Sequence, residues 1–472
     1  MRVLVLYAFL LSVFIGHNSF GQEAWTLQRC VNYALEHNLS VLRAEISSEL
    51  SATTVQQSRF ALFPTLNGST ARNWNFGYTI DPYTNNFTTG QVTSDNFSLN
   101  SAVTLFGGFQ LRKALQQSSL EYLAAGQDVR KIKNDISLNV VSAYLQVVYA
   151  KEQRKVAEGR VEQAQQQCDR LKRMVENGMA VQGNLLDADA QRAAEELALV
   201  SAVNQVELAR LALAQLLQLD QVVGFDVEDP LIAAPDTGLQ QKTLDEITAI
   251  ALSALPEMKA AEYRLRSAEK GVSAAQGGLY PRLTAFGQIS TFYASSAQRF
   301  AGVDTIGIVP IGATASGELV YAPTFRSRFE TNPFDEQVNQ NLNKIFGLSL
   351  NVPLFNGASS RLALRRARLN LESARLNHSG IKNQIAQSVQ QADADMRAAK
   401  ARYRSSSNAL TAFEAAFGYA SRRYDAGLIN SLEYLTALNN LTRAKIDALQ
   451  ARYDYIFRMK VLDFYAGIPL TL

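Results

Sequence analysis

The sequence predicts a membrane protein of mixed α and β structure, in which very long paired helices alternate with short two-faced strands. Three observations lead to this fold class. The chain contains one unit twice, long segments of each unit follow a seven-residue apolar repeat, and shorter segments alternate apolar with polar residues. A seven-residue repeat indicates coiled-coil helices, and alternation indicates strands with one apolar face.

The two copies of the unit are visible as identical residues at a constant offset. Thr26 recurs as Thr243, an offset of 217 (243 − 26), and Phe97 recurs as Phe346, an offset of 249 (346 − 97). The second copy therefore holds 32 extra residues (249 − 217) between Pro281 and Phe346. A repeat of more than 200 residues is far longer than the repeat of a solenoid, so it predicts one domain built of two similar halves.

The first residues are interpreted as a secretory signal peptide. Arg2 precedes an apolar run of about 13 residues, which is short of the roughly 20 that a spanning helix needs, and a small or polar stretch follows up to Gly21. We therefore expect a signal peptide over 1–21, a first structural repeat over 22–240 and a second over 241–472. Each repeat is expected to contain a helix, two strands and a long helical hairpin, with no transmembrane helix in the mature chain.

The longest predicted elements are two coiled-coil helices. Apolar residues step by four and three over 136–175 and again over 381–424. Segments 109–177 and 358–426 contain no proline and little glycine. Each is therefore predicted as one helix of 69 residues (177 − 109 + 1), roughly 100 Å long at 1.5 Å per residue.

A glycine marks the end of each long helix. Gly178 and Gly427 occupy the usual C-terminal stop position, and a second apolar-patterned helix is expected to begin near Asn184 or Leu432. Each half is thus predicted to contain a very long helical hairpin with a tight turn at its tip.

Between the helices the apolar period changes to two. The four segments with this pattern are 74–78, 97–105, 283–289 and 346–354. The nine residues of the last one match the roughly 9–11 that cross a bilayer as a tilted strand. Segments 79–95 and 294–342 are rich in Thr, Asn, Ser, Gly and Pro, so both are expected to be exposed loops, the second holding the 32 extra residues.

Four strands cannot close a barrel, and an open sheet edge in hydrocarbon is very costly. Because eight strands is the smallest usual number, the chain must oligomerise, and three copies would supply twelve strands. The apolar half of the last strand is then expected to face lipid. Its residues are Phe346, Leu348, Leu350, Val352 and Leu354.

Composition gives no sign of catalysis or of a bound cofactor. The formal net charge of +3 is close to balanced, so no nucleic acid partner is implied. Cys30 and Cys168 fit no metal or redox motif and are expected to be buried, and the three histidines have no metal-ligand spacing. No phosphate-binding glycine loop or nucleophile elbow is present in the sequence. We therefore predict no catalytic residues, no metal site, no cofactor and no enzymatic activity.

Several junctions resemble those of TolC-like outer-membrane efflux proteins. The segment VPLFNG at 352–357, followed by Arg361, is similar to the family's strand-to-helix junction, and 103–109 is its first-half counterpart. The segment 424–428 resembles the family's final periplasmic turn. The resemblance covers essentially the whole mature chain. The signal ending at 20–22 and the style of the loops suggest a Bacteroidetes member.

The resemblance implies a trimeric, twelve-stranded outer-membrane barrel that continues into a helical periplasmic tunnel. It implies the exit duct of a tripartite system in a Gram-negative bacterium, with a periplasmic adaptor and an inner-membrane transporter as partners. Two alternatives stay open: a type I protein-secretion duct, and an exported coiled-coil adhesin or scaffold that never enters the membrane.

The resemblance also suggests a periplasmic aperture. The family commonly places two aspartates, three residues apart, after the final turn, and the matching positions here are Glu433 and Thr436, with Asn184 and Asp187 in the first half. Glu433 keeps the charge and Thr436 does not. The alternative is that Glu433 is simply a solvated helix charge.

A basic residue that often braces the closed tips in the family corresponds to Ile429, so the brace is expected to be absent or moved. Tyr424 keeps its place and is expected to reach Asn184 of a neighbouring hairpin. The hairpin tips are the expected docking sites of the adaptor. Their residues are Gly178, Met179, Gly427 and Leu428.

Overall fold

The computed structural model describes residues 24–81, 83–219, 224–229 and 243–468. The signal peptide expected over 1–21 and the repeat boundary at 240 lie outside these residues. The chain forms two compact units, which we call the helical unit and the strand unit. The helical unit comprises the described parts of 1–52, 120–265 and 373–472, and the strand unit comprises 53–119 and 266–372.

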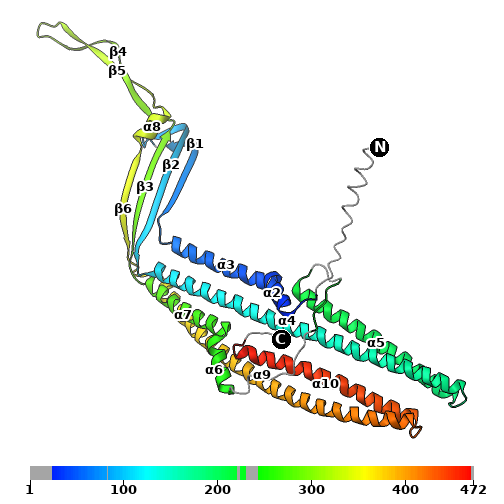
Figure 1. Cartoon of the computed structure of the whole chain (residues 1–472). Coiled ribbons are helices and arrows are strands. Elements are labelled where there is room, and N and C mark those ends of the chain that lie inside the picture. Colours follow the sequence, from blue (N-terminus) through cyan, green and yellow to red (C-terminus); the bar gives the residue numbers. More distant parts are fainter. Residues whose placement is uncertain (1–23, 82, 220–223, 230–242, 469–472) are drawn as a thin grey trace, which may run out of the picture. The chain divides into compact units, whose positions relative to one another are not determined.

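The order of elements is similar in the two halves (Figure 1). The first half contains α2 (Leu27–His37), α3 (Leu39–Phe60), β1 (Thr65–Ile80), β2 (Phe87–Gly107), α4 (Gln110–Glu176) and α5 (Gln182–Leu217). The second half contains α6 (Leu244–Ala254), α7 (Pro256–Gly277), β3 (Arg282–Ala294), β4 (Gln298–Ala313), β5 (Leu319–Thr331), α8 (Phe334–Gln340), β6 (Asn343–Asn351), α9 (Ser359–Asp425) and α10 (Ser431–Tyr465).

The two long helices are confirmed to within one residue at each end. Both α4 and α9 contain 67 residues. The predicted seam of α4 is buried at Ile136, Val140 and Val147, and that of α9 at Ile385 and Val389. The apolar repeat in the sequence therefore identified the side chains that pack in the helical unit.

The helix predicted at the start of each half is in fact two helices. Thr26 caps α2 by accepting a hydrogen bond from the backbone N–H of Arg29, and Thr243 caps α6 in a full capping box with Glu246. The break after α6 falls at Pro256, the first residue of α7, where a proline is tolerated because its missing N–H has no helical partner.

In the first half the matching break is made by Asn38. Its side-chain oxygen accepts from the N–H of Ser40 at 2.9 Å, and its amide nitrogen donates to the carbonyl of Leu216 at 3.0 Å. Asn38 is 5% exposed, so both bonds satisfy a polar side chain inside the helical unit.

Both cysteines are buried, as expected. Burial raises the pKa of the Cys30 thiol to about 12 and also raises that of Cys168. A thiol with a raised pKa is a poor nucleophile, so both residues act as small hydrophobic side chains.

The helix α5 is long and apolar enough, by length and composition alone, to cross a membrane. No transmembrane helix was predicted from the sequence in the mature chain, and α5 was not singled out. Its C-terminal half packs in the core of the helical unit with α4, through Val206, Leu213 and Leu217. The apolar character of α5 thus serves helix packing there.

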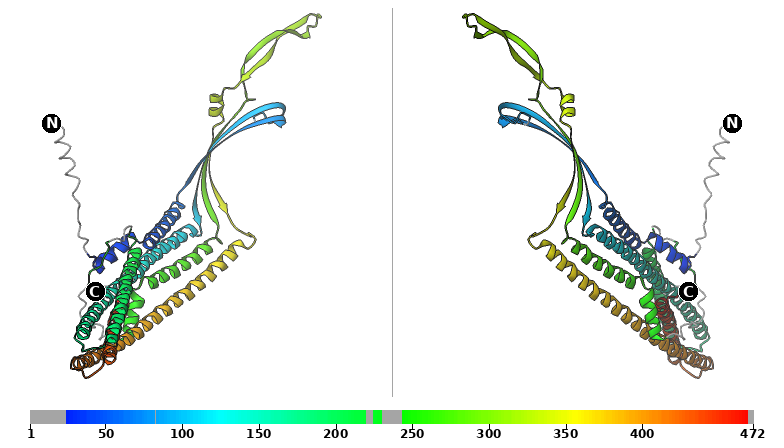
Figure 2. Two further views of the ribbon diagram at one scale, coloured as in Figure 1. Left: turned by 90° about the vertical axis from the view of Figure 1, so that its right-hand side faces the viewer. Right: turned by 90° about the vertical axis from the view of Figure 1, so that its left-hand side faces the viewer.

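In the strand unit, four antiparallel strands form one sheet in the order β1-β2-β3-β6. Figure 2 shows these strands twisting strongly about one another. The strands β1 and β6 are the two edges of the sheet. The expectation of four sheet strands is confirmed, and so is the lack of closure within the described part of one chain.

The expected loops were partly wrong. Segment 79–95 is mostly strand, because β1 and β2 are 16 and 21 residues long and only a short connection separates Ile80 from Phe87. Segment 294–342 holds β4 and β5, which pair with each other, and the short helix α8. Polar and glycine-rich composition described these segments correctly but did not exclude strand pairing.

The register of the sheet places apolar side chains on one face across all four strands. Leu350 lies opposite Leu283, and Leu348 opposite Ala285. The apolar sheet face comprises Leu66, Leu99, Val103, Leu283, Ala285, Ile289, Phe346, Leu348 and Leu350. The other face carries Ser349 and Thr284, and on it the hydroxyls of Ser69 and Ser98 are 2.7 Å apart. Of the five residues expected to face lipid, Val352 and Leu354 lie just beyond β6, because the strand ends at Asn351.

Candidate functional site

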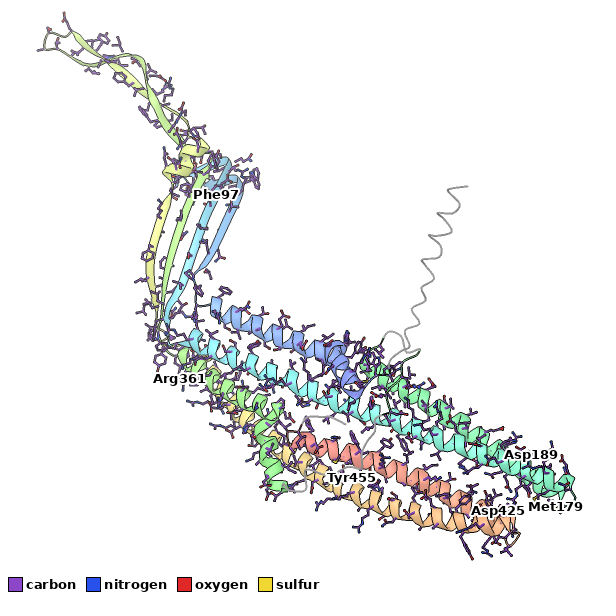
Figure 3. All side chains as sticks on the ribbon, viewed as in Figure 1. Phe97, Met179, Asp189, Arg361, Asp425 and Tyr455 are labelled. Carbon is purple, nitrogen blue, oxygen red and sulfur yellow. The ribbon has the colours of Figure 1, made fainter. Side chains whose placement is uncertain are left out.

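The tips of the two helical hairpins have the same backbone geometry. Gly178 and Gly427 adopt left-handed φ angles of 71° and 74°. In each tip the N–H of the following residue donates to the carbonyl five residues earlier, at 2.8 Å. This closed turn satisfies the last carbonyls of the long helix, and glycine adopts it without steric cost. Figure 3 labels Met179 and Asp425 at the ends of the two hairpins.

The second tip is capped and the first is not. The side chain of Asn430 accepts from the N–H of Glu433 at 2.9 Å at the start of α10, whereas Val181 precedes α5 without a side-chain cap. Glu433 therefore lies in the first turn of a helix, where a negative charge is favoured by the helix dipole. The hydroxyl of Thr436 donates to the carbonyl of Leu432 within the same helix.

Side chains of α4 connect the two hairpins near their tips. The amide nitrogen of Gln167 donates to the hydroxyl of Tyr424 at 2.7 Å. Arg170 forms an ion pair with Asp425, and its guanidinium lies 5.4 Å from the centre of the Tyr424 ring. We call these four residues the tip brace. It contains a charged contact between α4 and α9, whereas Ile429 has no charge to contribute.

Tyr424 also packs against the aromatic side chains of the second hairpin. The rings of Tyr424 and Tyr434 are stacked with their centroids 4.7 Å apart. The centroid of the Phe417 ring lies 5.6 Å from that of Tyr434. Burial raises the pKa of Tyr434. Within the chain, the hydroxyl partner of Tyr424 is Gln167 and not Asn184.

A groove lies beside the tip brace, between α4, α5 and α10. Asn184 and Asp187 line it, together with Tyr434. On the same groove Arg160 forms an ion pair with Glu195, whose side chain is only 6% exposed, and also reaches the amide oxygen of Asn439 at 3.3 Å. One arginine thus connects three helices of the two hairpins.

The tips end in exposed apolar side chains. Met179 and Leu428, the first residues after the two glycines, are 67% and 68% exposed, and Val181 and Leu432 are 73% and 71% exposed. Glu433 and Thr436 are exposed as well. Exposed apolar groups at a rigid turn favour contact with another protein over a role in catalysis.

In the part of the chain that the structure describes, no three His, Cys, Asp or Glu side chains form a group able to hold a metal ion. The chemistry at the tips consists of a hydrogen bond, an ion pair, stacked aromatic rings and exposed apolar groups. Such contacts can hold two hairpins together reversibly.

The chain matches a known protein family over most of its length. The model of the outer membrane efflux protein family matches residues 30–218 and 249–467. The chain belongs to this family. The two matched stretches fall in the two halves of the chain, and both hairpin tips lie within them.

Two known relatives of this efflux protein cover almost all of it. The outer membrane efflux protein BepC of Brucella suis is 23% identical over 457 residues, spanning 96% of this chain and 88% of that protein. The toxin and drug export protein A of Aggregatibacter actinomycetemcomitans is 21% identical over 447 residues, spanning 91% and 83%. Among solved structures, CusC superposes with a TM-score of 0.75 at 16% identity, covering 94% of this chain and 92% of CusC.

The protein is therefore an outer-membrane exit duct with a helical tunnel, and it is located in the outer membrane and extends into the periplasm. This finding decides against the adhesin or scaffold alternative. The family consists of outer membrane channel proteins. The expected mixed α and β fold, the function and the location are confirmed, and the expected trimer stays a prediction.

Proposed function

We propose that three copies of this chain form a closed twelve-stranded barrel and a continuous helical tunnel. The observation that supports this most directly is the pair of open edges, β1 and β6, on a sheet with apolar side chains along one face. Each unpaired backbone group costs several kcal/mol in hydrocarbon, so the edges must pair with other strands. A neighbouring copy supplies β1 for β6.

The helices offer matching evidence for neighbours. On α9 three leucines at seven-residue spacing, Leu362, Leu369 and Leu376, are 56%, 63% and 66% exposed. On α5 the side chains of Leu197 and Val200 are 68% and 65% exposed. A seven-residue apolar stripe in water is a coiled-coil seam without its partner, and helices of neighbouring copies would cover it.

Within this assembly the duct is passive, and a periplasmic adaptor and an inner-membrane transporter supply selectivity and energy. The cargo class stays open between small molecules and polypeptides, since both BepC and the toxin and drug export protein are relatives. The exposed apolar tips support docking of the adaptor at residues 178–181 and 427–432.

The docking proposal is tested by photocrosslinking in living cells. With a photoreactive residue in place of Met179 or Leu428, we expect crosslinks to a periplasmic adaptor, because these side chains project from the ends of both hairpins. Position 305 on β4 serves as the control. Adaptor crosslinks from position 305 and none from 179 or 428 would contradict the proposal.

We further propose that three copies of Glu433 form a carboxylate ring at the narrow periplasmic end. Like charges held close together in a constriction favour cations and bind multivalent cations. Glu433→Gln is therefore expected to weaken block by a trivalent cation and to reduce cation preference in planar bilayers. Glu318→Gln, an exposed acid between β4 and β5, should leave both unchanged. If the trivalent cation blocks the Glu433→Gln channel and the unsubstituted channel equally, Glu433 is only a solvated charge on the helix.

A further inference from the structure

The hairpin of β4 and β5 is the largest difference between the two halves of the strand unit. In the first half, β1 and β2 are joined by a short connection, whereas in the second half β3 and β6 are separated by two further strands and α8. In the described part of the chain, β4 and β5 pair with each other as a separate two-stranded sheet. Figure 2 shows this hairpin projecting beyond α8.

The hairpin is amphipathic. Residues of β5 alternate between its two faces, and each shares a face with its partner on β4. The apolar hairpin face comprises Phe300, Val303, Ile308, Leu319, Tyr321, Pro323, Phe325 and Phe329. Ile308 is 70% exposed and Phe325 is 60% exposed. The opposite face carries two ion pairs near the base, Arg299–Glu330 at 2.6 Å and Arg328–Asp304 at 3.4 Å, and the smaller apolar residues Val309, Val320 and Ala322 nearer the tip.

A fully buried glutamine fixes the base of the hairpin. The side-chain oxygen of Gln337 in α8 accepts from the N–H of Ala294 at 2.9 Å, and its nitrogen donates to the carbonyl of Asn332 at 2.8 Å. These bonds connect the end of β3 with the residue after β5. Arg299 adds an ion pair to Glu336 of α8. The hairpin is thus anchored to the strands that form the barrel wall.

An isolated two-stranded hairpin is at best marginally stable in water, and this one exposes a row of aromatic and branched side chains. The apolar hairpin face therefore needs a cover. Its segment, 298–331, contains three arginines and three acidic residues, a formal charge of zero. This balance does not favour an anionic lipid surface, and it leaves identical hairpins free to approach without repulsion.

We propose that the cover is the same hairpin from the other copies of this chain, so that three hairpins pack through their apolar faces at the outer end of the barrel. The proposal rests on the proposed trimer. Closure through the open edge β6 brings a second copy next to the strand that follows α8. With 16 residues at about 3.3 Å each, β4 spans roughly 50 Å, enough to reach a neighbouring hairpin.

The test uses full-length protein in outer-membrane vesicles and engineered cysteines. Phe325→Cys and Ile308→Cys place a thiol on the apolar hairpin face, and Thr324→Cys places one on the opposite face. The natural cysteines are buried, so the unsubstituted protein is the background control. After oxidation, a denaturing gel without reductant should show covalent dimers for both apolar-face variants and none for Thr324→Cys.

The size of the detergent-solubilised particle is measured separately by light scattering. A trimer without dimers from either apolar-face variant overturns the inference about the hairpin and leaves the proposed duct intact. Equal dimer yields from Thr324→Cys, or a crosslink to a different protein, also overturn it. A monomeric particle contradicts the proposed trimer itself and the inference with it.

Discussion

Arginine in place of Leu348 is expected to prevent stable insertion of this efflux protein into the outer membrane. Leu348 is 61% exposed and lies near the middle of β6, on the apolar sheet face opposite Ala285. An arginine at mid-membrane on the lipid face of a barrel costs roughly 2–4 kcal/mol, and three symmetric copies bring the total to about 6–12 kcal/mol. The measurement is the amount of heat-resistant oligomer recovered in the outer-membrane fraction.

The matched control is one residue away. Ser349 lies on the polar face opposite Thr284, which in a closed barrel faces the channel. Ser349→Arg is therefore expected to reach the outer membrane at nearly normal levels. Equal recovery of the Leu348→Arg and Ser349→Arg proteins would mean that the apolar sheet face does not contact lipid.

The long helices could be predicted from the sequence because a local pattern determines them. A seven-residue repeat over 136–175 and over 381–424 indicates a coiled-coil helix in each half, and Gly178 and Gly427 mark the C-terminal ends of the two helices. The break at Asn38 was not foreseen. It depends on a hydrogen bond to Leu216, far away in the sequence, which no local pattern contains.

Strands were predicted from a period of two, and β4 and β5 were both missed. In β4 the period is interrupted, and in β5 it is regular but lies in a segment whose polar and glycine-rich composition indicated a loop. In β4 the register shifts at three places, the first between Phe300 and Gly302. Each bulge adds a residue and reverses the alternation, so β4 shows no clean pattern in the sequence. The two faces of this hairpin become visible only through its pairing with the regular strand β5.

The contacts of the tip brace could not be predicted from the sequence. Tyr424 was recognised by resemblance, but Gln167 and Arg170 belong to another helix, and their register against α9 is a tertiary property. The internal repeat gave no signal either. The position equivalent to Arg170 in the second copy, 249 residues later, is Tyr419, and the position equivalent to Asp425 in the first copy is Glu176. The repeat therefore does not duplicate the pairing of Arg170 with Asp425.

Loss of the tip brace is expected to open the periplasmic end of the channel. We propose that opening separates the two hairpins, a movement that the ion pair of Arg170 with Asp425 would oppose. The pair is partly exposed, so each copy contributes only about 0.5–1 kcal/mol. Lost in all three copies, roughly 1.5–3 kcal/mol changes the ratio of open to closed channels by on the order of 10- to 150-fold.

Single-channel recording in planar bilayers measures this ratio directly. Asp425→Arg is expected to raise the open fraction strongly, because it replaces attraction to Arg170 by repulsion. Adding Arg170→Asp to the same protein restores opposite charges and should return the open fraction part of the way. Recovery will be incomplete, because Arg170 also lies over the ring of Tyr424, a contact that aspartate cannot make. If the charge-reversed double variant stays as open as Asp425→Arg alone, the ion pair does not hold the channel closed, and the hydrogen bond from Gln167 to Tyr424 becomes the main contact between the two hairpins.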